Sequence, residues 1–138
     1  MSKYITPTLT ITANMGTAST DPGPLSFALS LSATDKLTIA GRVESKVAAV
    51  TTTHTDNLIY DASVMGEVYV YINNVSDSTI YVCNADAGTD ANRFMNIRAG
   101  EFAFFPWSPA GTTVTDLYLD HSSGGTKNCE FWIFQVAA

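Results

Sequence analysis

The sequence has little charge, and most of the charge that it has is negative. Only 14% of its 138 residues are charged, whereas about 25% is usual in globular proteins. Seven Lys and Arg stand against 13 Asp and Glu, which gives a formal net charge of -6. The basic residues are scattered, so they form no stripe of the kind that nucleic acids or anionic lipids attract. We therefore expect no nucleic-acid partner and no membrane partner.

Cysteine and long apolar runs are also scarce. Cys83 and Cys129 are too few for a disulfide framework, and both lie in apolar, strand-like runs. We expect buried free thiols, while a single disulfide between the two stays open. No run approaches the roughly 20 apolar residues of a membrane span, and the first residues lack the apolar core of a signal peptide. The protein is thus expected to be made in a cytoplasm and to stay there until another process releases it.

Familiar catalytic motifs are missing. There is no G-x-S-x-G elbow, no P-loop and no G-x-G-x-x-G loop. Two histidines and two cysteines with apolar neighbours disfavour a Cys–His pair. We therefore predict that the protein is not an enzyme and carries no cofactor.

Two acidic segments are candidates for metal ligands. Residues 86–90 resemble part of a calcium loop but lack its further oxygen ligands, so a turn is favoured. Asp116, Asp120 and His121 are close in sequence, but strand alternation places His121 on the face opposite the two carboxylates. A polar strand end is favoured there, and His54, within a run of threonines, is expected to be exposed. No metal site is predicted.

Alternation with a period of two residues dominates what is present, and it is typical of half-buried strands. It recurs in nine segments: 8–12, 25–32, 37–47, 68–72, 80–83, 94–97, 102–105, 117–119 and 131–136. No run of ten or more residues carries a clear helical stripe. The loops at 73–78 and 99–100 are typical of hairpin turns, since Gly100 can adopt a positive φ.

These patterns predict an all-β fold, a single antiparallel β-sandwich of eight to ten strands. A jelly roll is favoured over a simple Greek key. Residues 1–24 are expected to form an N-terminal arm or the first strand, and residues 25–138 the sandwich domain. Thr and Ser, which make up 18 and 12 residues, would supply the neutral polar surface.

Aromatic side chains crowd the second half of the sequence, and some strands carry rings or other apolar groups on both faces. Strands of that kind need two covers, of which one is the second sheet. Three interpretations of the second face stay open. A partner subunit covers it, further core covers it, or it stays exposed as a platform on which sugars stack. As candidate interface residues we single out Trp107, Tyr69, Tyr71 and Phe105, with Trp107 expected to be exposed.

A family resemblance follows from the order of motifs in this half. The motifs are Gly-Glu-Val-Tyr-Val-Tyr-Ile-Asn-Asn at 66–74, Phe-Met-Asn-Ile at 94–97, Ala-Gly-Glu-Phe-Ala-Phe-Phe-Pro at 99–106, Asp-Leu-Tyr-Leu at 116–119 and Glu-Phe-Trp-Ile-Phe at 130–134. Over residues 57–138 this order resembles small β-sandwich structural proteins of tailed bacteriophages. Capsid decoration (cement), head-fibre and tail accessory proteins all fit the resemblance.

The resemblance implies a non-enzymatic virion protein, most simply a capsid decoration protein that stabilises the joints between capsomers. Its partners would be the major capsid protein or other virion subunits and further copies of itself, with a trimer favoured. The alternative is a carbohydrate-binding module of a tail or fibre for host attachment, in which Trp107, Tyr69 or Tyr71 stacks on sugars. A small sugar-active or metal-dependent enzyme is a third and weaker hypothesis.

Overall fold

The structure is a computed structural model that describes residues 3–14, 26–32, 37–52, 57–84, 92–108 and 116–137. Contacts divide the chain into two compact units, Met1–Ile39 and Ala40–Ala138. The domain boundary predicted between residues 24 and 25 lies outside the described residues and stays a prediction. The arm and first-strand alternatives for residues 1–24 also stay predictions.

The first unit consists of short antiparallel pairings. Strand β1 (Lys3–Ile5) pairs with the first three residues of β4 (Leu37–Val50), in the register Lys3↔Ile39. Strands β2 (Thr8–Asn14) and β3 (Ser26–Ser32) form a two-stranded sheet of their own. Both strands were predicted from their alternation, whereas β1 has only three residues and gives no such signal.

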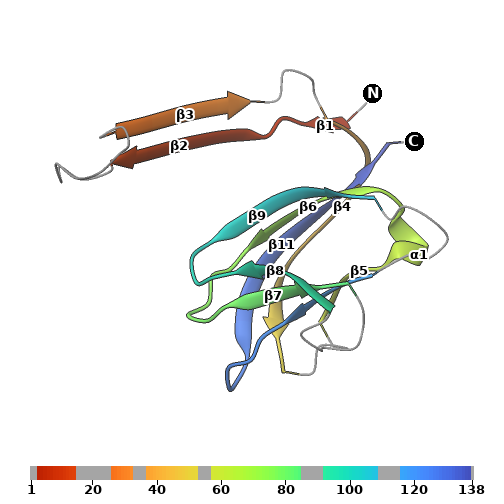
Figure 1. The fold of residues 1–138 in the computed structure, drawn as a ribbon. Coiled ribbons are helices and arrows are strands. Elements are labelled where there is room, and N and C mark those ends of the chain that lie inside the picture. Colours follow the sequence, from red (N-terminus) through yellow and green to blue (C-terminus); the bar gives the residue numbers. More distant parts are fainter. Residues whose placement is uncertain are drawn as a thin grey trace. The chain divides into compact units, whose positions relative to one another are not determined.

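The second unit is a sandwich of two antiparallel sheets (Figure 1). Besides β4, its strands are β5 (Leu58–Tyr60), β6 (Val68–Asn73), β7 (Ile80–Cys83), β8 (Arg93–Ile97), β9 (Phe102–Trp107), β10 (Leu117–Asp120) and β11 (Lys127–Val136). One sheet has the strand order β1-β4-β11-β6-β9, and the other has the order β5-β10-β7-β8. We call them the β11 sheet and the β10 sheet. The predicted all-β sandwich is confirmed, and its eight strands within the described residues, β4 to β11, lie within the predicted eight to ten.

The strand order is that of a jelly roll. Counting from β4, the first strand pairs with the eighth (β11), the second with the seventh, the third with the sixth and the fourth with the fifth. This nesting arises when one long antiparallel hairpin is rolled up, so that each pair adds to one of two sheets. The favoured topology is thus the observed one.

The core lies between the two sheets. Every second side chain of the central strands points inward, among them Val68, Val70 and Ile72 of β6, and Leu117 and Leu119 of β10. All five side chains are buried. The alternation therefore fixes which face of each strand is core and which face remains for solvent or a partner.

The two predicted hairpin loops are turns, but they do not join paired strands. Residues 74–79 connect β6 of the β11 sheet to β7 of the β10 sheet, and residues 98–101 connect β8 back to β9. Both loops therefore cross from one layer of the sandwich to the other, and the hairpin interpretation was wrong. Gly100 has the positive φ of 77° that was expected of it. The sequence of a loop indicates that the chain turns, but it does not indicate which sheet contains the next strand.

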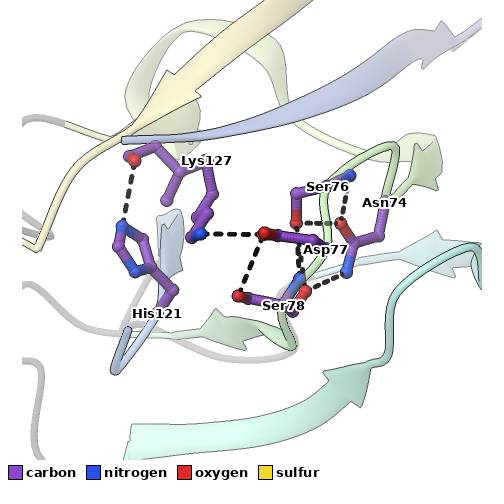
Figure 2. Close-up of polar contacts among 7 residues, drawn as sticks. Asn74, Ser76, Asp77, Ser78, His121 and Lys127 are labelled. Carbon is purple, nitrogen blue, oxygen red and sulfur yellow. Dashed lines mark hydrogen bonds and ion pairs between the residues drawn. The ribbon is translucent and has the colours of Figure 1, made fainter. Parts of the chain in front are cut away.

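Asn74, which is fully buried, joins these two crossovers. Its backbone N–H donates to the carbonyl of Glu101 at 2.9 Å, and its own carbonyl accepts from the N–H of Gly100 at 3.0 Å. Its side-chain amide donates to the carbonyls of Ser78 at 2.7 Å and Ile97 at 2.8 Å. Figure 2 shows the amide beside the loop that it closes. The bonds of this buried residue therefore hold the two crossover loops together.

A short segment between the sheets was not predicted. Helix α1 (Ala62–Met65) follows β5, and Asp61 caps it by accepting from the N–H of Ser63 at 2.9 Å. Four residues are too few for a helical period, which explains why the sequence pattern misses it. Within the described ranges, no helix is long and apolar enough to cross a membrane.

Candidate functional site

Aromatic rings cover the outer surface of the β11 sheet, on the side away from the core. Strand alternation and register bring together Tyr69 and Tyr71 of β6, Phe102 and Phe104 of β9, and Trp132 and Phe134 of β11. We call these residues the aromatic face. Tyr71 is its centre, because its Cα partners are Trp132 on one side and Phe104 on the other.

The rings of this face contact one another across and along the strands. Tyr69 stacks on Phe104 with ring centroids 6.2 Å apart and an interplanar angle of 15°. Trp132 stacks on Phe134 at 6.1 Å and 18°. Aromatic pairs, whether across strands as in Tyr69–Phe104 or along one strand as in Trp132–Phe134, each contribute on the order of 0.5–1 kcal/mol and limit the rotamers of both partners. The face is therefore preorganised.

Much of this aromatic surface is exposed. Phe102 is 56% exposed, Trp132 45% and Phe104 38%, while Tyr69, Tyr71 and Phe134 are half-buried. Scattered exposed apolar side chains are common, but a contiguous group on one face is typical of a contact surface. The chemistry that this arrangement offers is burial and stacking, with the hydroxyls of Tyr69 and Tyr71 as its polar groups.

The structure divides the four candidate interface residues between two faces. Tyr69 and Tyr71 belong to the aromatic face, as alternation along β6 requires. Phe105 and Trp107 have the opposite parity in β9, and both pack against the core cluster. Trp107 is half-buried and stacks on Phe94 of β8, with centroids 5.4 Å apart. The expectation of an exposed Trp107 was wrong, because the ring faces the space between the sheets.

Four rings of the face were not among the candidates. They are Phe102, Phe104, Trp132 and Phe134. For β11 the signal was available, since buried Phe131 and Ile133 alternate with Trp132 and Phe134. For β9 the alternation was ambiguous. Phe104 and Phe105 are adjacent, so either the even-numbered or the odd-numbered side chains of this strand could have faced the core.

The acidic and histidine candidates serve the fold. Asp116 accepts from the backbone N–H of Ala62 at 2.9 Å. Asp120 accepts from Arg93 Nε at 2.9 Å and Nη2 at 2.6 Å, and the Arg93 guanidinium lies 4.2 Å from the centroid of the Tyr81 ring. Among the residues that the structure describes, no three metal-ligating side chains lie together. His54 and residues 86–90 lie outside the described residues.

His121 is buried at the end of β10, where its Nε2 lies 3.0 Å from the carbonyl oxygen of Val50 (Figure 2). Its backbone N–H donates to Asp120 Oδ1 at 2.7 Å. The contact with Val50 links the end of β10 to the end of β4, so His121 has a structural role.

Both cysteines are buried free thiols, as expected. Burial raises the pKa of Cys83 to about 11 and that of Cys129 to about 12. Since the thiolate is the reactive form, neither side chain is suited to nucleophilic chemistry near neutral pH.

Comparisons with protein-family models, with curated proteins and with solved structures found no match to this chain. The resemblance to phage structural proteins therefore rests on the sequence motifs alone.

Proposed function

We propose that the protein is a non-enzymatic structural component of a tailed-bacteriophage virion, a capsid decoration protein that stabilises the joints between capsomers. The observation that carries the proposal is the aromatic face, a preorganised set of rings that the fold leaves uncovered. The sequence motifs of residues 57–138 are the reason for proposing a phage virion as the assembly. A jelly roll is compatible with this role, although the fold alone does not assign a function.

The physical basis of binding is the burial of rings that are now in water. Each square ångström of apolar surface removed from water contributes about 25 cal/mol before the costs of association are subtracted. Trp and Tyr are also the side chains that most often dominate the energetics of protein interfaces. Because stacking already restrains the rings, little side-chain entropy would be lost on binding.

The proposed partner is the major capsid protein, and the proposed form of the decoration protein is a homotrimer. A closed trimer would present three aromatic faces to three capsomers that meet at a joint. Tension at the joint would then have to expose all of these rings to water. That cost is the proposed mechanism of stabilisation.

Binding to empty capsids of the phage that encodes the protein tests this proposal. Phe104→Ser removes an exposed ring of the aromatic face and should weaken co-sedimentation with the capsids by about tenfold or more. Leu58→Ser is the matched control, because Leu58 is 44% exposed on the β10 sheet, and its binding should not change. Equal losses in the two variants would contradict the proposal.

The location of the protein in a reconstructed map of the same virion is the complementary test. We expect density on the outer capsid at the joints between capsomers. Density on the tail, or none on the particle, would refute the decoration role and leave the fold unaffected. Sedimentation of the free protein as a monomer would refute the trimer.

A further inference from the structure

An open hollow lies at one end of the aromatic face, where β4 and β11 run in the same sheet. Among the side chains that the structure describes, those lining it are Lys46 and Val47 of β4 and Glu130 and Trp132 of β11. The hollow measures about 470 Å³, within the roughly 300–1,000 Å³ that small-molecule sites occupy. It differs from the rest of the face because charged groups stand beside an exposed ring.

The indole of Trp132 contacts a neighbouring ring and also lines the hollow. Glu130 and Phe134 lie two residues before and after it on the same face of β11. Phe134 stacks on the ring, whereas Glu130 lines the hollow. The ring is therefore held in place by Phe134, and Trp132, which is 45% exposed, also lines the hollow.

Glu130 is also held in position. Asn73 of β6, its cross-strand partner, donates from Nδ2 to Glu130 Oε2 at 3.1 Å. Within the described part of the chain, Glu130 Oε1 receives no such bond, and Lys46 forms no ion pair. One acceptor and one donor thus remain available at the rim of the hollow.

The charges of Lys46 and Glu130 disfavour a ligand that carries a single charge. A cation that stacked on Trp132 would meet Lys46, and an anion would meet Glu130. A neutral ligand with an apolar face and several hydroxyl groups avoids both repulsions. Its hydroxyls can donate to the carboxylate and accept from the ammonium, and such charge-assisted bonds are the stronger ones.

We propose that this hollow, the Trp132 site, binds a neutral hexopyranose unit of a glycan. The C–H face of the sugar ring stacks on the free surface of the indole. One hydroxyl donates to Glu130 Oε1 and another accepts from Lys46 Nζ. This site goes beyond the decoration role. Trp132 also belongs to the aromatic face, so capsid and glycan would compete for its ring, whereas the capsid test above uses Phe104 on the β9 side.

The test is an array of neutral oligosaccharides of glucose, galactose, mannose and N-acetylglucosamine, probed with the full chain. Binding to at least one of these glycans is expected, and Trp132→Ala should reduce it below detection. Glu130→Gln should weaken it by about tenfold or more, because it removes a charge-assisted acceptor. Lys46→Met, a change at an exposed side chain, should weaken it to a similar extent.

Phe104→Ser is the matched control, since it lies on the same face but does not line the hollow. It should lose capsid binding and keep glycan binding, and Lys46→Met should do the reverse. The two proposals can therefore fail separately. The Trp132 site is refuted if no neutral glycan binds, if Lys46→Met and Trp132→Ala bind as the wild type does, or if choline or sialylated glycans bind in place of neutral ones.

Discussion

The outer faces of the two sheets carry aromatic side chains in very different settings. On the β10 sheet, the hydroxyl of Tyr81 lies 3.4 Å from Ser122 Oγ, and the hydroxyl of Tyr118 donates to Asp116 Oδ2 at 3.3 Å. A guanidinium, that of Arg93, also covers the Tyr81 ring. On the β11 sheet the rings contact mainly one another.

The difference shows that the number of rings does not decide whether a face suits water. On the β10 sheet, polar groups contact the tyrosine hydroxyls, so these side chains need no partner protein to satisfy them. The aromatic face has gained its rigidity from stacking but keeps its apolar area exposed. The same jelly roll therefore has one sheet whose outer tyrosines contact polar groups and one sheet whose outer rings contact mainly one another.

The largest effect that we expect comes from the polar network of the β10 sheet. Asp120→Ala leaves the guanidinium of Arg93, which is only 19% exposed, without its main acceptor. Loss of one partner from such a buried pair should lower the free energy of unfolding by about 3 kcal/mol. Urea unfolding measures it, with Asp77→Asn as an exposed carboxylate control. A change below about 1 kcal/mol would show that this face does not depend on the network.

The two cysteines allow the opening of the two sheets to be compared, because Cys83 is in β7 and Cys129 is in β11. Both thiols are buried, with pKa values raised to about 11 and about 12. At pH 8, labelling by iodoacetamide should be at least about 100-fold slower in the folded chain than in urea. Rapid labelling of Cys129 alone would mean that the β11 sheet opens by itself.

A smaller loss of stability is expected from the aromatic face. Phe104→Ser should lower the free energy of unfolding by about 1 kcal/mol, since the ring is exposed and loses one stacked neighbour. It should also reduce the fluorescence of an apolar dye that binds the folded protein. Leu58→Ser should leave the dye signal unchanged, and an equal reduction would remove the distinction between the two faces.

The smallest effect concerns the exposed ion pair of Asp77 and Lys127 (Figure 2), whose Oδ1–Nζ distance is 2.7 Å. The hydrogen bond from Lys127 holds the pKa of Asp77 below its usual 3.8. A lowered pKa stabilises the folded state above pH 3.8, and this stabilisation is lost as the pH falls through the folded-state pKa.

Asp77→Asn should therefore be slightly less stable than the wild type near neutral pH, and the difference should vanish in acid. Unfolding curves over this range measure it. A difference that grows toward acid pH would have the wrong sign for this pair.

The sequence pattern predicted much of the fold. Alternation is a property of neighbouring residues, and it predicted β2, β3, β4 and β6 through β11. It also predicted that β6 and β11 carry rings or other apolar groups on both faces. It missed β1, β5 and α1, whose three or four residues are shorter than a reliable period. In β9 it could not choose between adjacent Phe104 and Phe105, and the candidate site was divided as a result.

The sequence by itself determined the all-β class, the alternation of most strands and the scarcity of charge, because each of these is a property of neighbouring residues. Only the tertiary structure decided which sheet each strand joins, and so which rings gather on one surface. Tyr71, Phe104 and Trp132 are far apart along the chain, and hydrogen bonding between β9, β6 and β11 makes them neighbours. Burial then separates Trp107 from them, since the second sheet covers only one side.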